Sequence, residues 1–335
     1  MAAQKKSIDK ATQQLSEKAR KDGVSTAWDR LETQTPQCSF GEIGICCRNC
    51  FMGPCRIDPF GEKADKGVCG ADADTIAARN FTRMIAGGAS AHSDHGRDAA
   101  LTLLETAQGK AQGYQIKDEE KLRATAELFG INTQGLAKEK IAQELAEKAL
   151  AEFGKKEGEL TFIKRAPEKT QKRWRAHGVV PRSIDREIVE VMHRTHMGVD
   201  QEYKNILSQG TRAALGDGWG GSMIATELQD ILFGTPKPIR SKINLGVLKE
   251  DQVNVIVHGH EPILSEMIVL AASDKELLKL TQEKGAKGIN LAGMCCTANE
   301  ILMRHGIPVA GNFLQQEMAI VTGAVDAMVV DVQCV

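Results

Sequence analysis

The last third of the chain alternates between short apolar runs and stretches with helical spacing. The apolar runs predict strands at residues 253–257, 288–292, 308–310 and 327–332. Helical spacing predicts helices between them at residues 262–272, 297–305 and 314–322. Because alternating strands and helices favour right-handed crossovers, this part of the chain is expected to form a doubly wound parallel sheet.

The residues before this sheet have a different pattern. Residues 1–37 are polar with apolar positions at helical spacing, and residues 74–107 predict a helix interrupted at Gly87-Gly88. Residues 38–70 contain few periodic apolar positions, so we expect an irregular loop that bound metal holds together. The expected fold class is thus α + α/β, with a helical segment at 1–37, a metal-binding loop region at 38–70, a helical domain at 71–235 and an α/β domain at 236–335.

Composition narrows the class of protein. The 335 residues carry 43 Lys and Arg against 44 Asp and Glu, a formal net charge of -1, and only 4% aromatic residues. A nucleic-acid-binding protein would need a basic excess or stacking aromatics, so this class is disfavoured. No run of about 20 apolar residues predicts a membrane span, and the N-terminus lacks the apolar centre of a signal peptide. We therefore expect a cytoplasmic protein.

Six of the nine cysteines fall within residues 38–69. Four of them have the spacing Cys47-x2-Cys50-x4-Cys55-x13-Cys69. An iron–sulfur cubane takes four cysteine thiolates from a closely folded loop of this kind. A structural zinc site is the alternative, but such sites usually repeat the C-x2-C pair, which occurs here once. The spacing favours an iron–sulfur cluster.

Cys38 and Cys46 remain outside this set. Two thiolates cannot complete a four-ligand site, so the pair could form a disulfide, be buried as small apolar residues, or supply half of a site that a second chain completes. Cys46 directly precedes Cys47, and its side chain is therefore expected to point away from the first cluster.

Two pairs of histidines have helical spacing. His92, His95 and Asp98 lie three residues apart, which would align groups able to pass protons along one helix face. The alternative is a polar face in solvent. His193 and His196 have the same spacing among charged residues, and we expect them on the surface.

Cysteine and histidine residues also follow the predicted strands. His258 and His260 follow the first strand, Cys295 and Cys296 follow the second, and Cys334 follows the last. Ligands of parallel sheets bind beyond the carboxyl ends of the strands, so these residues would converge at one edge. Such ligands suit zinc, nickel or part of an iron–sulfur cluster, although a small cysteine can also simply be buried.

With these residues identified, the sequence closely resembles the anaerobic, nickel-containing carbon monoxide dehydrogenases. The resemblance extends over essentially the whole chain, and its motifs are specific in combination. They lie at residues 46–55 with Cys69, and at residues 89–97, 257–262 and 290–300. Family members are homodimers with a helical N-terminal domain followed by two Rossmann-like domains. The α/β domain predicted at 236–335 would be the first of these.

The resemblance assigns roles to the candidate residues. It implies that Cys47, Cys50, Cys55 and Cys69 hold a [4Fe–4S] cluster within the subunit, and that Cys38 and Cys46 hold half of a [4Fe–4S] cluster shared across the dimer axis. It implies that His260, Cys296 and Cys334 bind the Ni–4Fe–4S active cluster, with Cys295 near that cluster and His258 behind its ligands. His92 and His95 match a proton-relay helix, and Asp98 and Leu101 stand at the positions where many relatives extend it.

The implied reaction is the reversible oxidation of CO with water to CO2, two protons and two electrons. The electrons would leave through the [4Fe–4S] clusters to a ferredoxin-like acceptor, and a nickel-insertion factor or an acetyl-CoA synthase subunit are further expected partners. The related hybrid-cluster proteins, which reduce hydroxylamine, are an alternative, as is a non-catalytic iron–sulfur electron carrier.

One feature departs from the family. Family enzymes are nearly twice as long, and their second half supplies three more cysteine ligands of the active cluster and an assisting lysine. This sequence therefore resembles the N-terminal half only, with its Rossmann-like domain incomplete.

Overall fold

The computed structural model describes residues 7–58 and 60–331. By its internal contacts the chain divides into two compact units, residues 37–232 and residues 1–36 together with 233–335. Residues 1–36 are thus grouped with the α/β residues, whereas the sequence suggested a separate segment. Cys334 lies outside the described residues.

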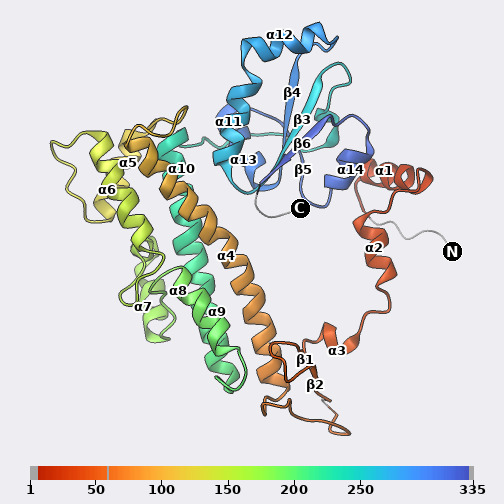
Figure 1. Cartoon of the computed structure of the whole chain (residues 1–335), viewed down its shortest axis with the longest axis vertical. Coiled ribbons are helices and arrows are strands. Elements are labelled where there is room, and N and C mark those ends of the chain that lie inside the picture. Colours follow the sequence, from red (N-terminus) through yellow and green to blue (C-terminus); the bar gives the residue numbers. More distant parts are fainter. Residues whose placement is uncertain (1–6, 59, 332–335) are drawn as a thin grey trace. The chain divides into compact units, whose positions relative to one another are not determined.

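The unit formed by residues 37–232 is mainly helical (Figure 1). Its elements are α3 (Ser39–Glu42), β1 (Cys46–Cys47), β2 (Cys55–Arg56), α4 (Ala73–Ala107), α5 (Glu119–Leu128), α6 (Lys138–Ala151), η1 (Thr161–Arg165), α7 (Glu168–Ala176), α8 (Asp185–Arg194), α9 (Tyr203–Gly216), η2 (Asp217–Gly221) and α10 (Ser222–Phe233). Figure 1 shows the long helix α4 running beside α9 and α10, with β1 and β2 near its N-terminal end.

Helix α4 is continuous over its 35 residues. Asp72 caps its N-terminus by accepting a hydrogen bond of 2.8 Å from the backbone N–H of Thr75. The predicted interruption at Gly87-Gly88 is wrong. A glycine in a helix costs about 1 kcal/mol relative to alanine, and packing of α6, α8 and α9 against α4 offsets this cost.

Glycines bring α4 close to the helices that follow it. A Cβ atom on Gly96 would lie 2.6 Å from the carbonyl oxygen of Gly221, and one on Gly210 would lie 2.5 Å from Cγ2 of Thr82. Only glycine permits such an approach. The π-helical turn η2 therefore lies directly against the middle of α4, where His92 and His95 are located.

The second unit contains a four-stranded parallel sheet of order β5-β4-β3-β6. Its elements are α1 (Lys10–Lys21), α2 (Ala27–Thr33), η3 (Leu245–Val247), β3 (Val253–Gly259), α11 (Pro262–Ala272), α12 (Lys275–Glu283), β4 (Ile289–Met294), α13 (Cys295–His305), β5 (Val309–Gly311), α14 (Gln316–Val321) and β6 (Ala327–Val330).

Alternate residues of the strands pack on opposite faces of this sheet. Ile256 lies in a core with Met318 of α14 and with Leu15 of α1. The next residue, Val257, lies in a second core with Val269 of α11 and Ile301 of α13. Helices thus cover both faces, as parallel sheets require.

The expected mixture of helical structure and a parallel α/β sheet is confirmed, and each predicted strand of the sheet is present to within two residues. The strand order reverses beside β3: β4 and β5 lie on one side of it, and β6 lies on the other. Such a reversal opens a crevice at the carboxyl ends of the strands, where α/β proteins bind ligands.

Candidate metal centres

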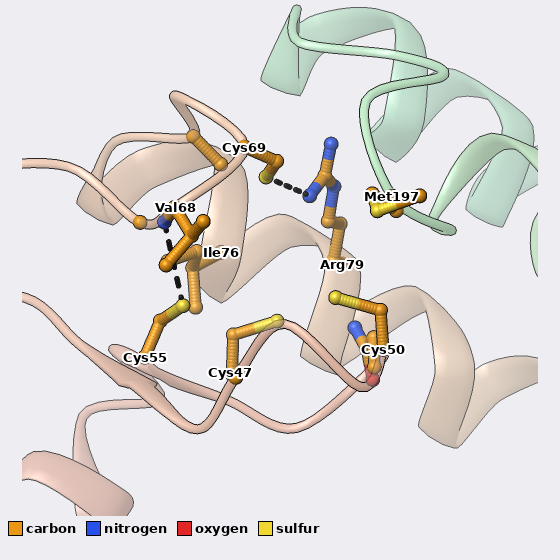
Figure 2. A pocket seen from close by; sticks show the side chains of 12 residues that line it. Cys47, Cys50, Cys55, Val68, Cys69, Ile76, Arg79 and Met197 are labelled. Carbon is orange, nitrogen blue, oxygen red and sulfur yellow. Dashed lines mark hydrogen bonds between the residues drawn. The ribbon is translucent and has the colours of Figure 1, made fainter.

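Cys47, Cys50, Cys55 and Cys69 line one cavity of the helical unit. The antiparallel pair β1 and β2 places Cys47 opposite Cys55, and Cys50 lies in the connection between these strands. Cys69 lies just before α4. Figure 2 shows the four side chains around a common space. The four cysteines that the spacing groups thus line the same cavity, and their role as cluster ligands stays a prediction.

Gly53 allows the connection between β1 and β2 to close tightly. A Cβ atom at this position would lie 3.2 Å from both the carbonyl oxygen of Cys47 and the amide nitrogen of Cys55. A larger residue would push apart the two strands that carry these thiols.

The cavity offers hydrogen-bond donors to sulfur. The backbone N–H of Val68 donates to Sγ of Cys55 over 3.5 Å, and Nη1 of Arg79 donates to Sγ of Cys69 over 3.6 Å (Figure 2). Burial raises the pKa of the Cys69 thiol, but the backbone N–H of Ala71, the Arg79 side chain and the backbone N–H of Gly198 together lower it below its ordinary value. The cavity therefore favours a thiolate at Cys69.

Arg79 and Met197 also line this cavity, and neither was predicted from the sequence. One feature of the sequence could have pointed to Arg79. It lies three residues after Ile76 on α4, so a charged residue stands on the apolar side of a helix. Met197 comes from the segment between α8 and α9, about 130 residues further along the chain than Cys69, which local patterns cannot connect.

These donors fit an iron–sulfur cubane. Four thiols face one space, N–H groups point at two of the sulfurs, and a buried cation lies beside them. Within residues 7–58 and 60–331, no three His, Cys, Asp or Glu side chains are close enough to hold a single metal ion. A cubane needs no such closeness, because each thiolate binds a different iron.

Cys38 and Cys46 are free thiols outside this cavity. Cys38 is exposed and Cys46 is half-buried, so the two cysteines are not fully buried apolar residues of the core. The backbone N–H groups of Gly41 and Phe40 lower the pKa of the exposed Cys38 thiol. Nδ2 of Asn80 donates to the carbonyl oxygen of Cys46 over 2.8 Å and thereby fixes the backbone there. As expected, Cys46 does not share the cavity of its neighbour Cys47.

His92 and His95 face the η2–α10 region. Nδ1 of His92 donates to Oδ1 of Asp217 over 2.5 Å. Nε2 of Gln229 lies 2.5 Å from Nε2 of His95, whose side chain is only 4% exposed. His95 is therefore not part of a solvent-exposed polar face, although Asp98, at the same helical spacing, is exposed. His193 and His196 are exposed, as expected.

Partial desolvation by the surrounding protein raises the pKa of Asp98 even though its side chain reaches solvent, and the nearby Asp94 raises it further, against the lowering effect of Arg97. Asp217 and Gln229 were not identified from the sequence. Both lie more than 120 residues after these histidines. Asp217 reaches His92 and Gln229 reaches His95 only through the close packing of η2 on α4.

The candidate ligands of the sheet lie at the carboxyl ends of β3 and β4. Gly259 and Cys295 form an isolated parallel bridge, so His260 and Cys296 follow on two adjacent strands. His258 is fully buried, and its Nε2 lies 2.7 Å from Oε1 of Gln316. Cys295 has φ of 63° at the start of α13, and Cys296 is exposed rather than buried.

Asp331 connects the segments that follow β3 and β4. Its carboxylate accepts hydrogen bonds from the backbone N–H groups of His260 at 2.5 Å and Glu261 at 3.0 Å, and from the hydroxyl of Thr297 at 3.2 Å. Burial raises the pKa of Asp331, against the lowering effect of these bonds and of His258. Asp331 immediately follows β6, so the end of a third strand reaches the same place. Asp331 was not predicted as a site residue from the sequence.

Comparison with known proteins identifies the family. Residues 45–335 match the family model described as Prismane/CO dehydrogenase family. The chain belongs to this family. Carbon monoxide dehydrogenase 1 of Methanosarcina mazei is 64% identical over 330 residues, which are 98% of this chain and 52% of that protein. Carbon monoxide dehydrogenase 1 of Carboxydothermus hydrogenoformans is 51% identical over 342 residues, which are 100% of this chain and 53% of that protein.

Solved structures show the same similarity. The carbon monoxide dehydrogenase of Thermococcus sp. AM4, in a nickel-free form, has a TM-score of 0.94 and 54% identity over 100% of this chain and 54% of that one. A chain of an acetyl-CoA synthase/carbon monoxide dehydrogenase has a TM-score of 0.94 and 48% identity over 98% of this chain and 49% of that one. The predicted resemblance to carbon monoxide dehydrogenases is confirmed.

The chain spans about half the length of the curated relatives it matches. These relatives are named as carbon monoxide dehydrogenases. Among the described residues, no helix has the length and apolar character needed to cross a bilayer.

Proposed function

We propose that this chain is the N-terminal half of an anaerobic nickel-containing carbon monoxide dehydrogenase, which oxidises CO with water to CO2, two protons and two electrons. The observation that carries the proposal is the cavity where Cys47, Cys50, Cys55 and Cys69 meet beside a buried arginine. When bound, the iron–sulfur clusters supply one-electron transfer and the Ni–4Fe–4S cluster supplies CO chemistry.

The proposed ligands form three separate cluster-binding sites. Cys47, Cys50, Cys55 and Cys69 hold the intrasubunit [4Fe–4S] cluster. Cys38 and Cys46 supply half of a [4Fe–4S] cluster that a second copy completes, which makes the protein a homodimer. His260, Cys296 and Cys334 are ligands of the active cluster, and Asp331 orients the backbone at His260.

His92 and His95 are proposed to carry protons away from the active cluster. Asp217 holds Nδ1 of His92 as a hydrogen-bond donor, so proton exchange falls to Nε2. Gln229 holds the ring of the buried His95 at the other nitrogen: its amide N–H group donates to Nε2, which leaves the ring proton on Nδ1. A ferredoxin-like protein is the proposed electron acceptor, and an acetyl-CoA synthase subunit is a further proposed partner.

Metal analysis of anaerobically purified chain tests this proposal. We expect a dimer with about six irons per chain, four in the intrasubunit cluster and half of a shared four. Cys50→Ser should remove the intrasubunit cluster, whereas Cys46→Ser should remove only the shared cluster and weaken the dimer. Zinc alone in a colourless monomer, or unchanged iron content in Cys50→Ser, would contradict the proposal.

The active cluster requires a separate measurement. Co-expression with the second half of a close relative should give a complex that contains nickel and oxidises CO. Cys296→Ser should lower nickel in this complex and leave the iron of the cluster at Cys47 in place. A nickel-free complex with full iron content would limit the chain to electron transfer.

A further inference from the structure

Arg79 is a buried cation whose described contacts include no carboxylate. Its side chain is 1% exposed. Nη2 donates to the carbonyl oxygen of Asp200 over 2.6 Å, Nη1 donates to Sγ of Cys69 over 3.6 Å, and Nε has no hydrogen-bond partner in the described part of the chain. A buried guanidinium is stable only when a nearby negative charge compensates it. The cavity beside Arg79 is therefore built for an anionic group.

The segment between α8 and α9 holds Arg79 and the cysteine loop together. Asp200 accepts from Arg79 through its carbonyl, and Nε2 of Gln201 donates to the carbonyl oxygen of Cys69 over 2.9 Å. The hydroxyl of Thr75 donates to the carbonyl oxygen of Gln201 over 3.0 Å. These contacts fix the guanidinium in one position relative to the Cys69 sulfur.

We infer that Arg79 is a positioning residue that raises the reduction potential of the cluster at Cys47, Cys50, Cys55 and Cys69. The inference rests on the function proposed above. Reduction adds negative charge to the cavity, and a fixed cation in a medium of low polarity stabilises the reduced form more than the oxidised form. Hydrogen bonds to cluster sulfurs act in the same direction.

Arg48 provides a matched control. It is exposed, and it lies in the chain between two of the ligands, Cys47 and Cys50. Loss of its charge changes the net charge as much as loss of Arg79, but water screens its effect on the cluster. A reduction potential set by net charge alone would respond equally to both changes. One set by the buried guanidinium would respond to Arg79 alone.

The test is an anaerobic redox titration of the full chain, monitored by electron paramagnetic resonance. All variants carry Cys46→Ser, so that only one cluster gives the signal. At the midpoint potential of the parent, Arg79→Gln should lower the ratio of reduced to oxidised cluster at least tenfold, which corresponds to about 59 mV. Arg48→Gln should change the ratio less than twofold. An unchanged midpoint in an iron-replete Arg79→Gln protein would overturn the inference.

Arg79→Lys keeps the charge and loses the planar fork, so its midpoint should fall between those of the parent and Arg79→Gln. If Arg79→Gln assembles no cluster, Arg79→Met takes its place, because it also removes the charge. A midpoint equal to the parent's in an iron-replete Arg79→Met protein would then reject the role of Arg79. Failure of the parent itself to bind iron would instead contradict the proposed function.

Discussion

Gly221 crosses α4 so closely that a Cβ atom on it would lie 2.6 Å from the carbonyl oxygen of His92. Backbone lies against backbone at this point, so no flexible side chain can move aside. The same crossing brings Asp217 and Gln229 to the two histidines of α4. The geometry of the candidate proton relay therefore depends on a residue without a side chain.

We expect Gly221→Ala to lower the free energy of unfolding by about 1–3 kcal/mol, because overpacking displaces α4 from η2. Chemical denaturation measures the change. Gly218→Ala is the control in the same π-helical turn, since a Cβ there meets nothing within 4 Å. It should leave stability unchanged or increase it by up to about 1 kcal/mol. Equal losses in both variants would show that the crossing is not the cause.

The order of helices and strands was largely predictable from the sequence because it depends on local periodicity. Strand β3 is a β-branched run, and α11 begins with proline and follows the predicted bounds. The continuity of α4 through Gly87 was not predictable in this way. It depends on helices that pack against α4 from later in the chain.

The cysteine cavity was predictable because its four cysteines lie within one short segment. Residues that arrive from distant segments were not. Asp217 and Asp331 are ordinary charged residues in the sequence, and only tertiary packing brings them to His92 and His260. Spacing therefore predicts well which cysteines lie together, and predicts poorly which residues from later in the chain contact His92 and His260.

Asn80 should fix the Cys46 backbone. Its Nδ2 donates to the carbonyl oxygens of Gly44 at 2.9 Å and Cys46 at 2.8 Å. Asn80→Ala leaves both carbonyls without this donor, so we expect a loss of about 1–2 kcal/mol and faster amide exchange at residues 44–47. Hydrogen exchange with mass spectrometry measures this. Asn80→Asp, similar in shape but without the donor, should behave like Asn80→Ala, and normal protection in Asn80→Asp would exclude the hydrogen bonds as the cause.

Asp331 should order the backbone at His260. Asp331→Ala removes the acceptor for the N–H groups of His260 and Glu261, so we expect a loss of about 1–3 kcal/mol and faster exchange at these two amides. Asp326→Ala is the control, because Asp326 accepts from the N–H of Asn254 near the start of β3, over 2.8 Å. It should also lower stability, yet leave the exchange at residues 260 and 261 unchanged. Faster exchange there in both variants would assign the effect to the sheet as a whole.

Glu190 should make the stability of the helical unit depend on acid pH. Its carboxylate accepts from Nη2 of Arg182 over 2.5 Å and from Nε of Arg194 over 2.9 Å. Burial raises the pKa of Glu190, but the hydrogen bonds and charges of Arg182 and Arg194 outweigh this and lower the pKa from 4.5 to about 2. A lowered pKa of an acid stabilises the fold above the unfolded value, and this contribution disappears as the pH falls from about 4.5 to about 2.

We therefore expect Glu190→Gln to be less stable than the parent at pH 7, by about 1–2 kcal/mol once solvent screening of the pair is included. The difference should shrink as the pH falls from 4.5 toward 2, the window set by the pKa of Glu190. Denaturant unfolding at a series of pH values measures this difference.

Glu168→Gln is the control, because the side chain of Glu168 is 79% exposed and pairs only with Lys172 of its own helix in the described contacts. It should change stability by less than about 0.5 kcal/mol at any pH. A Glu190→Gln difference that persists unchanged below pH 3 would show that lost packing, rather than the charge of Glu190, destabilises the variant.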